Sequence, residues 1–164
     1  MLAIIGCGNP NRLDDGAGVY VAQQLIQRLK DSPNQEIRIF DAGTSGMDVM
    51  FQARGCDELI IIDANQSNSA PGTIFEVPGE ELENTPEPSY NLHDFRWDNA
   101  LYAGRKIYHD EFPKEVSVFL IEAKSIDYGL GLTQPVQDAS GRVIELVIGK
   151  INQYLKTNEP NKII

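Results

Sequence analysis

The sequence has few of the residues that mark disulfide-rich or zinc-binding proteins. It contains two cysteines and two histidines in 164 residues, and neither a C-x-x-C pair nor an H-E-x-x-H motif. The scarcity of thiols argues against a secreted, disulfide-bonded scaffold and favours a reducing compartment. We therefore expect a cytoplasmic protein in which Cys7 and Cys56 are small core residues.

Long apolar runs and an excess of basic residues are also missing. The apolar stretch at positions 1–5 is too short for a signal peptide or a membrane span, and it predicts a buried strand instead. Lys and Arg number 14 against 24 Asp and Glu, a formal net charge of −10. Such a charge opposes phosphate backbones and anionic lipids, so we expect neither nucleic acid nor membranes as partners.

The composition is that of an ordinary globular protein. Hydrophobic residues make up 41% and charged residues 23% of the chain, whose length suits one core. No repeat, low-complexity tract or long linker divides it. We expect a single domain over residues 1–156 and a flexible C-terminal tail over 157–164.

Strand and helix patterns alternate along the chain. Apolar, turn-bounded runs predict strands at 2–6, 36–40, 59–62, 73–77 and 116–121. Helical periodicity covers 15–30, a short segment with Met47, Met50 and Phe51 inward, 94–103, and 135–155 with Leu146 on its apolar face. The segment 79–90 reads as a surface loop. This order predicts a three-layer α/β/α sandwich around a mostly parallel, five-stranded twisted sheet, with the direction of the fourth strand left open.

Acidic residues follow the first three predicted strands. The first leads to Asp14 and Asp15, the second to Asp41 and the third to Asp63, while His93 lies on a later loop. Ligands of open α/β sheets bind beyond the carboxyl ends of the strands, where these side chains would meet. Carboxylates with one imidazole suit a borderline divalent metal such as nickel or zinc. Aspartate is also a common cap and turn residue, so each of them has a structural alternative.

Several other chemistries do not fit the motifs. The Gly6–Gly8 turn resembles the start of a dinucleotide-binding loop, but Asn11 stands where the third glycine belongs and Pro10 removes an N–H from the loop. We interpret this G-x-G as a tight turn. No G-x-S-x-G motif is present. Cys7 could face His93, but nothing in the sequence indicates such a pair.

Six segments carry a resemblance to a known family, and they occur in that family's order. The segments are IGCGN at 5–9, LDDGAGV at 13–19, DAGTSGM at 41–47, IIIDA at 60–64, APGT at 70–73 and GLTQPV at 131–136. They resemble the hydrogenase maturation endopeptidases over nearly the whole chain apart from the tail. His93 stands where that family has its metal-binding histidine.

The resemblance implies a function and a set of site residues. It implies a phosphorylase/hydrolase-like fold and an aspartic-type, metal-assisted endopeptidase that removes the C-terminal extension of a nickel-iron hydrogenase large-subunit precursor. Asp15, Asp63 and His93 would bind nickel that belongs to the precursor, so no permanently bound cofactor is expected. Asp41 corresponds to a further aspartate that is important for activity. We expect the protein to act as a monomer.

One departure from the family leaves alternatives open. The family often has glutamate at position 15, and aspartate is one methylene shorter, about 1.5 Å at fixed backbone. The turn 9–13 would have to compensate, or Asp14 could be the ligand instead. The metal could be a recognition handle or a Lewis acid. The other functions to consider are a metal-dependent amino- or other peptidase with its own metal, and a non-enzymatic nickel-binding maturation chaperone.

Overall fold

A five-stranded sheet forms the centre of the protein. The structure, a computed structural model, describes residues 1–82 and 96–158. The strands lie in the order β2-β1-β3-β5-β4. Their bounds are β1 Leu2–Cys7, β2 Ile37–Gly43, β3 Glu58–Asn65, β4 Ile74–Pro78 and β5 Glu115–Glu122. The first four in that order are parallel, whereas β4 is antiparallel to β5. This confirms the mostly parallel sheet and gives the direction of the fourth strand.

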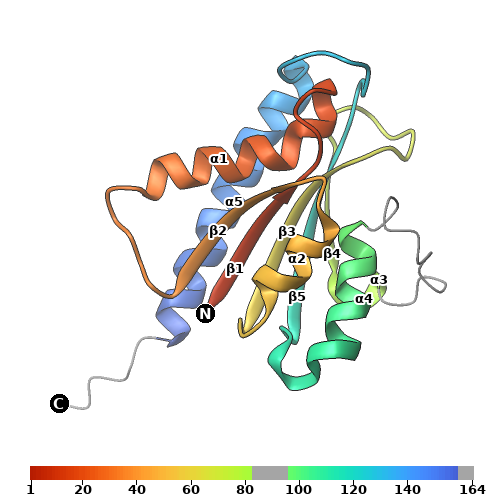
Figure 1. The fold of residues 1–164 in the computed structure, drawn as a ribbon. Helices are drawn as coiled ribbons and strands as arrows, with labels where there is room; N and C mark the ends of the chain where they lie inside the picture. Colours follow the sequence, from red (N-terminus) through yellow and green to blue (C-terminus); the bar gives the residue numbers. More distant parts are fainter. Residues whose placement is uncertain (83–95, 159–164) are drawn as a thin grey trace.

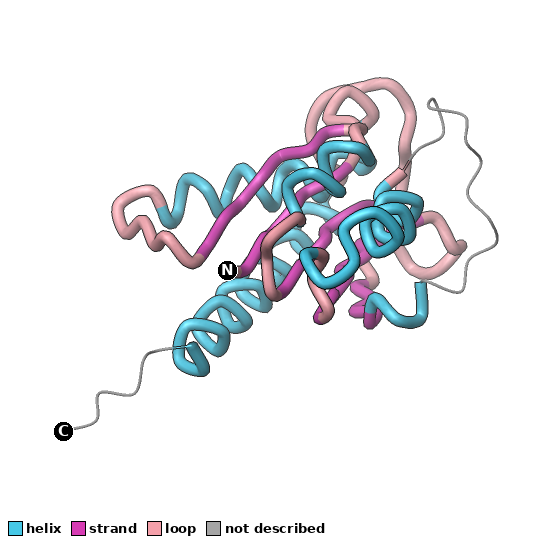
Figure 2. The backbone as a smooth tube through the Cα atoms, turned by 60° about the horizontal axis from the view of Figure 1, so that its bottom comes forward, coloured by secondary structure: helices cyan, strands magenta, loops and turns pink. Residues whose placement is uncertain are grey.

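Helices cover both faces of the sheet (Figures 1 and 2). Helices α1 and α5 pack on one face, and α2 and α4 pack on the other. Their bounds are α1 Ala17–Leu29, α2 Gly46–Ala53, α4 Trp97–Tyr108 and α5 Gln134–Asn158, with a short α3 at Gly79–Leu82. In the part of the chain that the structure describes, no helix is long and apolar enough to cross a bilayer.

Alternate residues of strand β1 pack into the cores on the two faces of the sheet. Successive side chains of a strand point to opposite faces. Leu2 and Ile4 accordingly join the core under α1 and α5, while Ala3 and Ile5 join the core under α2 and α4. A strand buried on both sides needs apolar residues throughout, which is why it appears in the sequence as a continuous apolar run. The predicted three-layer α/β/α sandwich is confirmed.

Two predicted core residues lie on the surface instead. Phe51 is 53% exposed and Leu146 is 47% exposed. In each case an adjacent residue, Met50 or Val147, takes the buried position. One residue corresponds to about 100° of rotation around a helix, so an apolar neighbour of a core position can point outward.

Some predicted boundaries shift. The predicted surface loop 79–90 begins with the short helix α3, and its remaining residues lie outside the described part. Helix α4 begins at Trp97 rather than at position 94 and continues to Tyr108. Helix α5 ends at Asn158, so the first two residues of the predicted tail are helical, and 159–164 lie outside the described residues.

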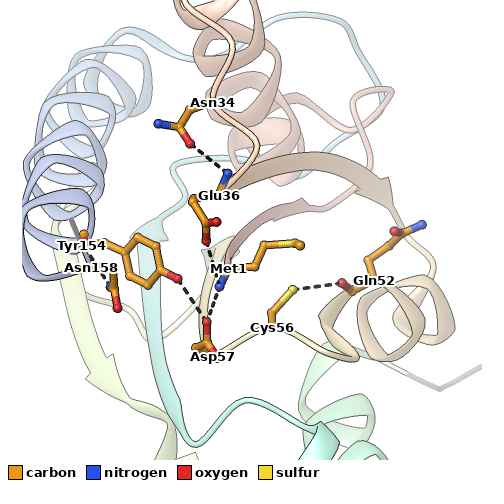
Figure 3. Close-up of polar contacts among 8 residues, drawn as sticks. All are labelled: Met1, Asn34, Glu36, Gln52, Cys56, Asp57, Tyr154 and Asn158. Atoms are coloured by element: carbon orange, nitrogen blue, oxygen red, sulfur yellow. Dashed lines mark hydrogen bonds and ion pairs between the residues drawn. The ribbon is translucent and has the colours of Figure 1, made fainter. Parts of the chain in front are cut away.

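At the amino ends of the strands, polar contacts attach α5 to the sheet (Figure 3). The carboxylate of Asp57, just before β3, accepts a hydrogen bond of 3.1 Å from the Tyr154 hydroxyl of α5. The amino group of Met1 pairs with Asp57 and with Glu36. Cys56 lies beside this cluster, and both cysteines are free and buried as expected. These contacts lie at the end of the sheet opposite the carboxyl edge.

Helix α1 approaches the sheet so closely that only glycine fits at the contact. A Cβ on Gly18 would lie 2.1 Å from the carbonyl oxygen of Ile62 and 2.4 Å from that of Cys7. A Cβ on Gly6 would lie 2.1 Å from the carbonyl oxygen of Gly18. The helix backbone thus rests directly on β1 and β3. This contact also sets the position of the turn that precedes α1.

We expect Gly18→Ala to lower the free energy of unfolding by about 1–3 kcal/mol or more, because its Cβ overlaps backbone atoms that cannot rotate away. The matched control is Gly149→Ala in α5, where a Cβ meets nothing within 4 Å. There alanine should raise the stability by up to about 1 kcal/mol through helix propensity. Chemical denaturation measures both, and equal stability of the two variants would contradict the close packing.

Candidate active site

A cavity of about 230 Å³ lies at the carboxyl ends of the parallel strands. Its wall combines the ends of β1 and β3, the turn before α1, the loop between β2 and α2, and the start of α4. The lining residues are Cys7, Gly8, Asp15, Gly43, Thr44, Ser45, Gly46, Asp63, Arg96 and Trp97. Two of the three predicted metal ligands, Asp15 and Asp63, therefore share one cavity. The third, His93, lies outside the described residues.

Asp63 is a buried carboxylate with two neutral donors and one cationic partner among the described residues. It is 5% exposed, and its Oδ1 accepts a hydrogen bond of 2.8 Å from the Ala64 backbone N–H. Its Oδ2 accepts one of 2.7 Å from the Trp97 indole N–H, and the Arg96 guanidinium lies 3.4 Å from the same oxygen. Burial raises the pKa of Asp63 to about 6, and the hydrogen bond from Trp97 only partly offsets this rise.

The preceding turn directs Asp15 toward the same cavity. Its Oδ2 accepts a hydrogen bond of 3.1 Å from the Asn9 backbone N–H. Asp15 also lines a second, polar cavity of about 450 Å³, together with Arg12 and Arg96. Gly8 lies against this turn with φ of 121°, and a Cβ there would be 1.8 Å from the Asp15 carbonyl oxygen. The G-x-G motif therefore serves a tight turn, as its sequence indicates.

Asp14 faces the interior and is completely engaged. It is 0% exposed. Its Oδ1 accepts from the Thr133 N–H, and its Oδ2 accepts from the Thr133 hydroxyl and from the N–H groups of Lys124 and Ser125. The four distances lie between 2.7 and 3.1 Å. Of the two adjacent aspartates, the geometry therefore leaves Asp15 as the one open to a ligand.

Asp41 lies beside the cavity rather than in its wall. It is exposed near the end of β2, two residues before the lining segment that begins at Gly43. Its Oδ2 accepts a hydrogen bond of 2.9 Å from the Gln23 side-chain amide, and its Oδ1 accepts one of 3.0 Å from the Gly43 N–H. The carboxylate is thus held by Gln23 and by Gly43, a residue of the cavity wall, at the same edge of the sheet as Asp63.

Cys7 lines the cavity, but its surroundings suppress thiolate formation. The thiol is buried, and burial raises its pKa far above the usual range, with a further contribution from the negative charge of Asp63. Reactive cysteines need the opposite environment, exposed and electropositive. A cysteine nucleophile paired with His93 is therefore disfavoured.

The sequence patterns did not identify Arg96 and Trp97, although both contact Asp63. One signal was present, because Trp97 is the chain's only tryptophan and follows His93 by four residues. The indole N–H of a buried tryptophan needs an acceptor, and Asp63 supplies it. The packing of α4 against β3 determines which residue is that acceptor. Local sequence patterns do not reveal this packing.

The raised pKa of Asp63 predicts that its ionisation lowers the free energy of unfolding as pH rises. An unfolded aspartate titrates near 3.8, whereas Asp63 titrates near 6, so the folded protein keeps this proton to higher pH and loses stability as pH rises through that window. We expect Asp63→Asn to increase the free energy of unfolding at pH 7 by up to about 3 kcal/mol, and by progressively less toward pH 4. Denaturation across this range measures the difference, and a gain independent of pH would contradict the assignment.

Comparisons with known proteins identify the family of this chain. The model of a family described as hydrogenase maturation protease matches residues 19–150. Hydrogenase 2 maturation protease of Escherichia coli (strain K12) is 29% identical over 155 residues, which cover 93% of this chain and 91% of the relative. The hydrogenase expression/formation protein HupD of Rhizobium leguminosarum bv. viciae is 26% identical over 155 residues, covering 93% of this chain and 75% of the relative.

Solved structures share the fold. The hydrogenase maturating endopeptidase HybD from E. coli has a TM-score of 0.76 at 26% identity, with 93% of each chain covered. A NiFe hydrogenase maturation protease, HybD from Thermococcus kodakarensis, has the same fold with a TM-score of 0.70 at 21% identity over 90% of this chain and 97% of that one. These matches confirm the resemblance carried by the six sequence segments. This chain belongs to the hydrogenase maturation protease family and is a peptidase.

Proposed function

We propose that this protein is an endopeptidase that removes the C-terminal extension of a nickel-loaded hydrogenase large-subunit precursor. The observation that carries the proposal is the pair of carboxylates, Asp15 and Asp63, in the wall of one cavity at the carboxyl edge of the sheet. Family membership indicates peptide hydrolysis, and this pair of carboxylates is where a metal ion of the substrate would bind.

Nickel in this proposal belongs to the substrate. Asp15, Asp63 and His93 are its protein ligands, and two carboxylates with one imidazole suit a borderline divalent ion. Within residues 1–82 and 96–158 no group of three or more metal-binding side chains occurs, so the third ligand is taken from the segment that the structure does not describe. Three ligands without a thiolate make an open, weak site, unlike the closed four-ligand sites of structural zinc. A weak site can recognise the nickel in the precursor without removing it from the precursor.

The nickel can assist cleavage in two ways. It can fix the scissile peptide beside the carboxyl edge, so that attack by water becomes nearly unimolecular. It can also polarise the carbonyl or the attacking water as a Lewis acid. In both cases Asp41 is the proposed catalytic group, which orients or deprotonates the water. Its support is positional, because Gln23 and Gly43 hold its carboxylate and Gly43 lines the cavity.

The experiment that tests this function compares nickel-loaded and nickel-free precursor, read by mass. The purified protein should carry far less than one metal per chain. It should cleave the loaded precursor without added metal and leave the nickel-free precursor intact. His93→Ala should abolish cleavage with little change in thermal unfolding, because the proposal gives this residue a role as a ligand and none in the core.

Two outcomes would reject the proposal. Efficient cleavage of nickel-free precursor by protease pre-loaded with nickel or zinc would show that the metal belongs to the enzyme, as in an ordinary metallopeptidase. Binding of the loaded precursor with no cleavage at all would indicate a nickel-binding chaperone.

Asp41 should matter for turnover more than for recognition, because it lies outside the proposed ligand set. We expect Asp41→Asn to bind nickel-loaded precursor as the parent protein does and to cleave it at least about 100-fold more slowly, the usual range for loss of a general base. Binding assays and single-turnover cleavage separate these effects. Loss of nickel-dependent binding as complete as in His93→Ala would overturn this division of roles.

A further inference from the structure

The guanidinium of Arg96 is paired with a proposed nickel ligand. Its Nη2 lies 3.4 Å from Oδ2 of Asp63. The other donors to Asp63, the Ala64 N–H and the Trp97 indole, are neutral. Among the residues that the structure describes, Arg96 is therefore the cation that offsets this buried carboxylate. An ionised carboxylate removed from water needs such compensation.

Arg96 also occupies the approach to both carboxylates. Arg96 and Asp15 line the 230 Å³ cavity that contains Asp63, and both also line the neighbouring 450 Å³ cavity. The guanidinium therefore lies where the two cavities adjoin. A metal ion that contacts Asp15 and Asp63 together has to share this space with a positive charge or displace it.

The backbone of Arg96 is anchored, whereas its side chain is free to leave. Arg96 is the N-cap residue of α4, and its carbonyl oxygen accepts from the Ala100 N–H at 3.0 Å. The adjacent Trp97 is buried and bonded to Asp63. The Arg96 side chain is nevertheless 67% exposed, and a contact of 3.4 Å is longer than a good charged hydrogen bond. Its movement into water breaks a weak contact and exposes little new surface.

We propose that Arg96 is an internal competitor of the metal ion: it pairs with Asp63 while the site is empty, and it has to leave when a metal binds. This inference rests on the proposed function. A free divalent ion displaces the guanidinium only through its charge and its coordinate bonds to the carboxylates, whereas nickel held in a precursor also arrives with the peptide contacts of a whole protein surface. Arg96 thus lowers occupancy by free metal and favours the metal presented by the substrate.

The test is calorimetric titration of the full chain with NiCl₂ and with ZnCl₂. The variants are Arg96→Gln, Arg96→Lys and the matched control Arg12→Gln. Arg12 lines the same polar cavity and loses the same charge, but its Nε donates to the Ile126 carbonyl at 3.0 Å and its guanidinium packs over the Tyr128 ring. Because an ion pair with one exposed partner is modest, Arg96→Gln should bind free metal about 3- to 10-fold more tightly. Arg12→Gln should stay within about twofold of the parent, and Arg96→Lys should lie between parent and Arg96→Gln.

A purely structural role for Arg96 would change thermal unfolding but not metal affinity, so melting curves accompany each titration. Unchanged or weaker binding by Arg96→Gln, an equal gain in Arg12→Gln, or no metal binding by any variant would overturn the inference. If Arg96→Gln does not fold, unchanged affinity in Arg96→Lys overturns it. In a second readout, free Zn²⁺ should inhibit cleavage of the loaded precursor by Arg96→Gln at lower concentration than it inhibits the parent.

The two proposals fail in different ways. If the parent protein cleaves nickel-loaded precursor but Arg96→Gln leaves metal affinity unchanged, the role of Arg96 is rejected and the proposed function is supported. Tighter metal binding by Arg96→Gln, with no cleavage of the precursor by the parent protein, rejects the function and supports the competition at Asp63.

Discussion

The carboxyl edge of the sheet depends on the buried carboxylate of Asp14. It accepts four hydrogen bonds, two from Thr133 and one each from the backbone N–H groups of Lys124 and Ser125. A buried charge with fewer partners would be strongly unfavourable, so this network couples the turn after β1 to the connection between β5 and α5. Because Asp14 turns inward, the next residue, Asp15, faces the cavity. A structural aspartate thereby positions one of the proposed metal ligands.

Two other buried carboxylates at this edge, Glu122 and Asp63, differ in their hydrogen-bond partners and in the direction of their pKa shifts. Glu122 accepts from both the backbone and the hydroxyl of Ser67, from the Asn65 amide and from the Ser69 N–H. Burial alone would raise the pKa of Glu122, but these donors lower it below the ordinary value. Among the described residues, Asp63 accepts three hydrogen bonds against four for Glu122, and its pKa is raised. Glu122 is satisfied by neutral donors within the fold, whereas Asp63 pairs with an exposed guanidinium and faces a cavity.

The sequence contained more about the sheet than about the cavity. Apolar runs located the strands, and the rule that parallel strands end at one edge brought Asp15 and Asp63 together. The inward or outward direction of Asp14 and Asp15 could not be derived, because it depends on hydrogen bonds with a segment more than 100 residues away. The same holds for Arg96 and Trp97, whose contact with Asp63 arises from the packing of α4 against β3. Periodicity identifies a helix face only to within a residue, which explains the exposed Leu146.

Under the proposed function, the site recognises a metal that belongs to another protein, and such a site has to satisfy opposing requirements. The buried charge of Asp63 attracts cations strongly, because little water screens it. Left alone, it would also collect free divalent ions and block the substrate. The Trp97 indole and the Ala64 N–H stabilise the carboxylate without competing for its charge, since both are neutral. In the proposed role of Arg96, its exposed guanidinium competes for that charge, and because it is attached to the chain and easily moved, it weakens free-ion binding without closing the cavity to a substrate.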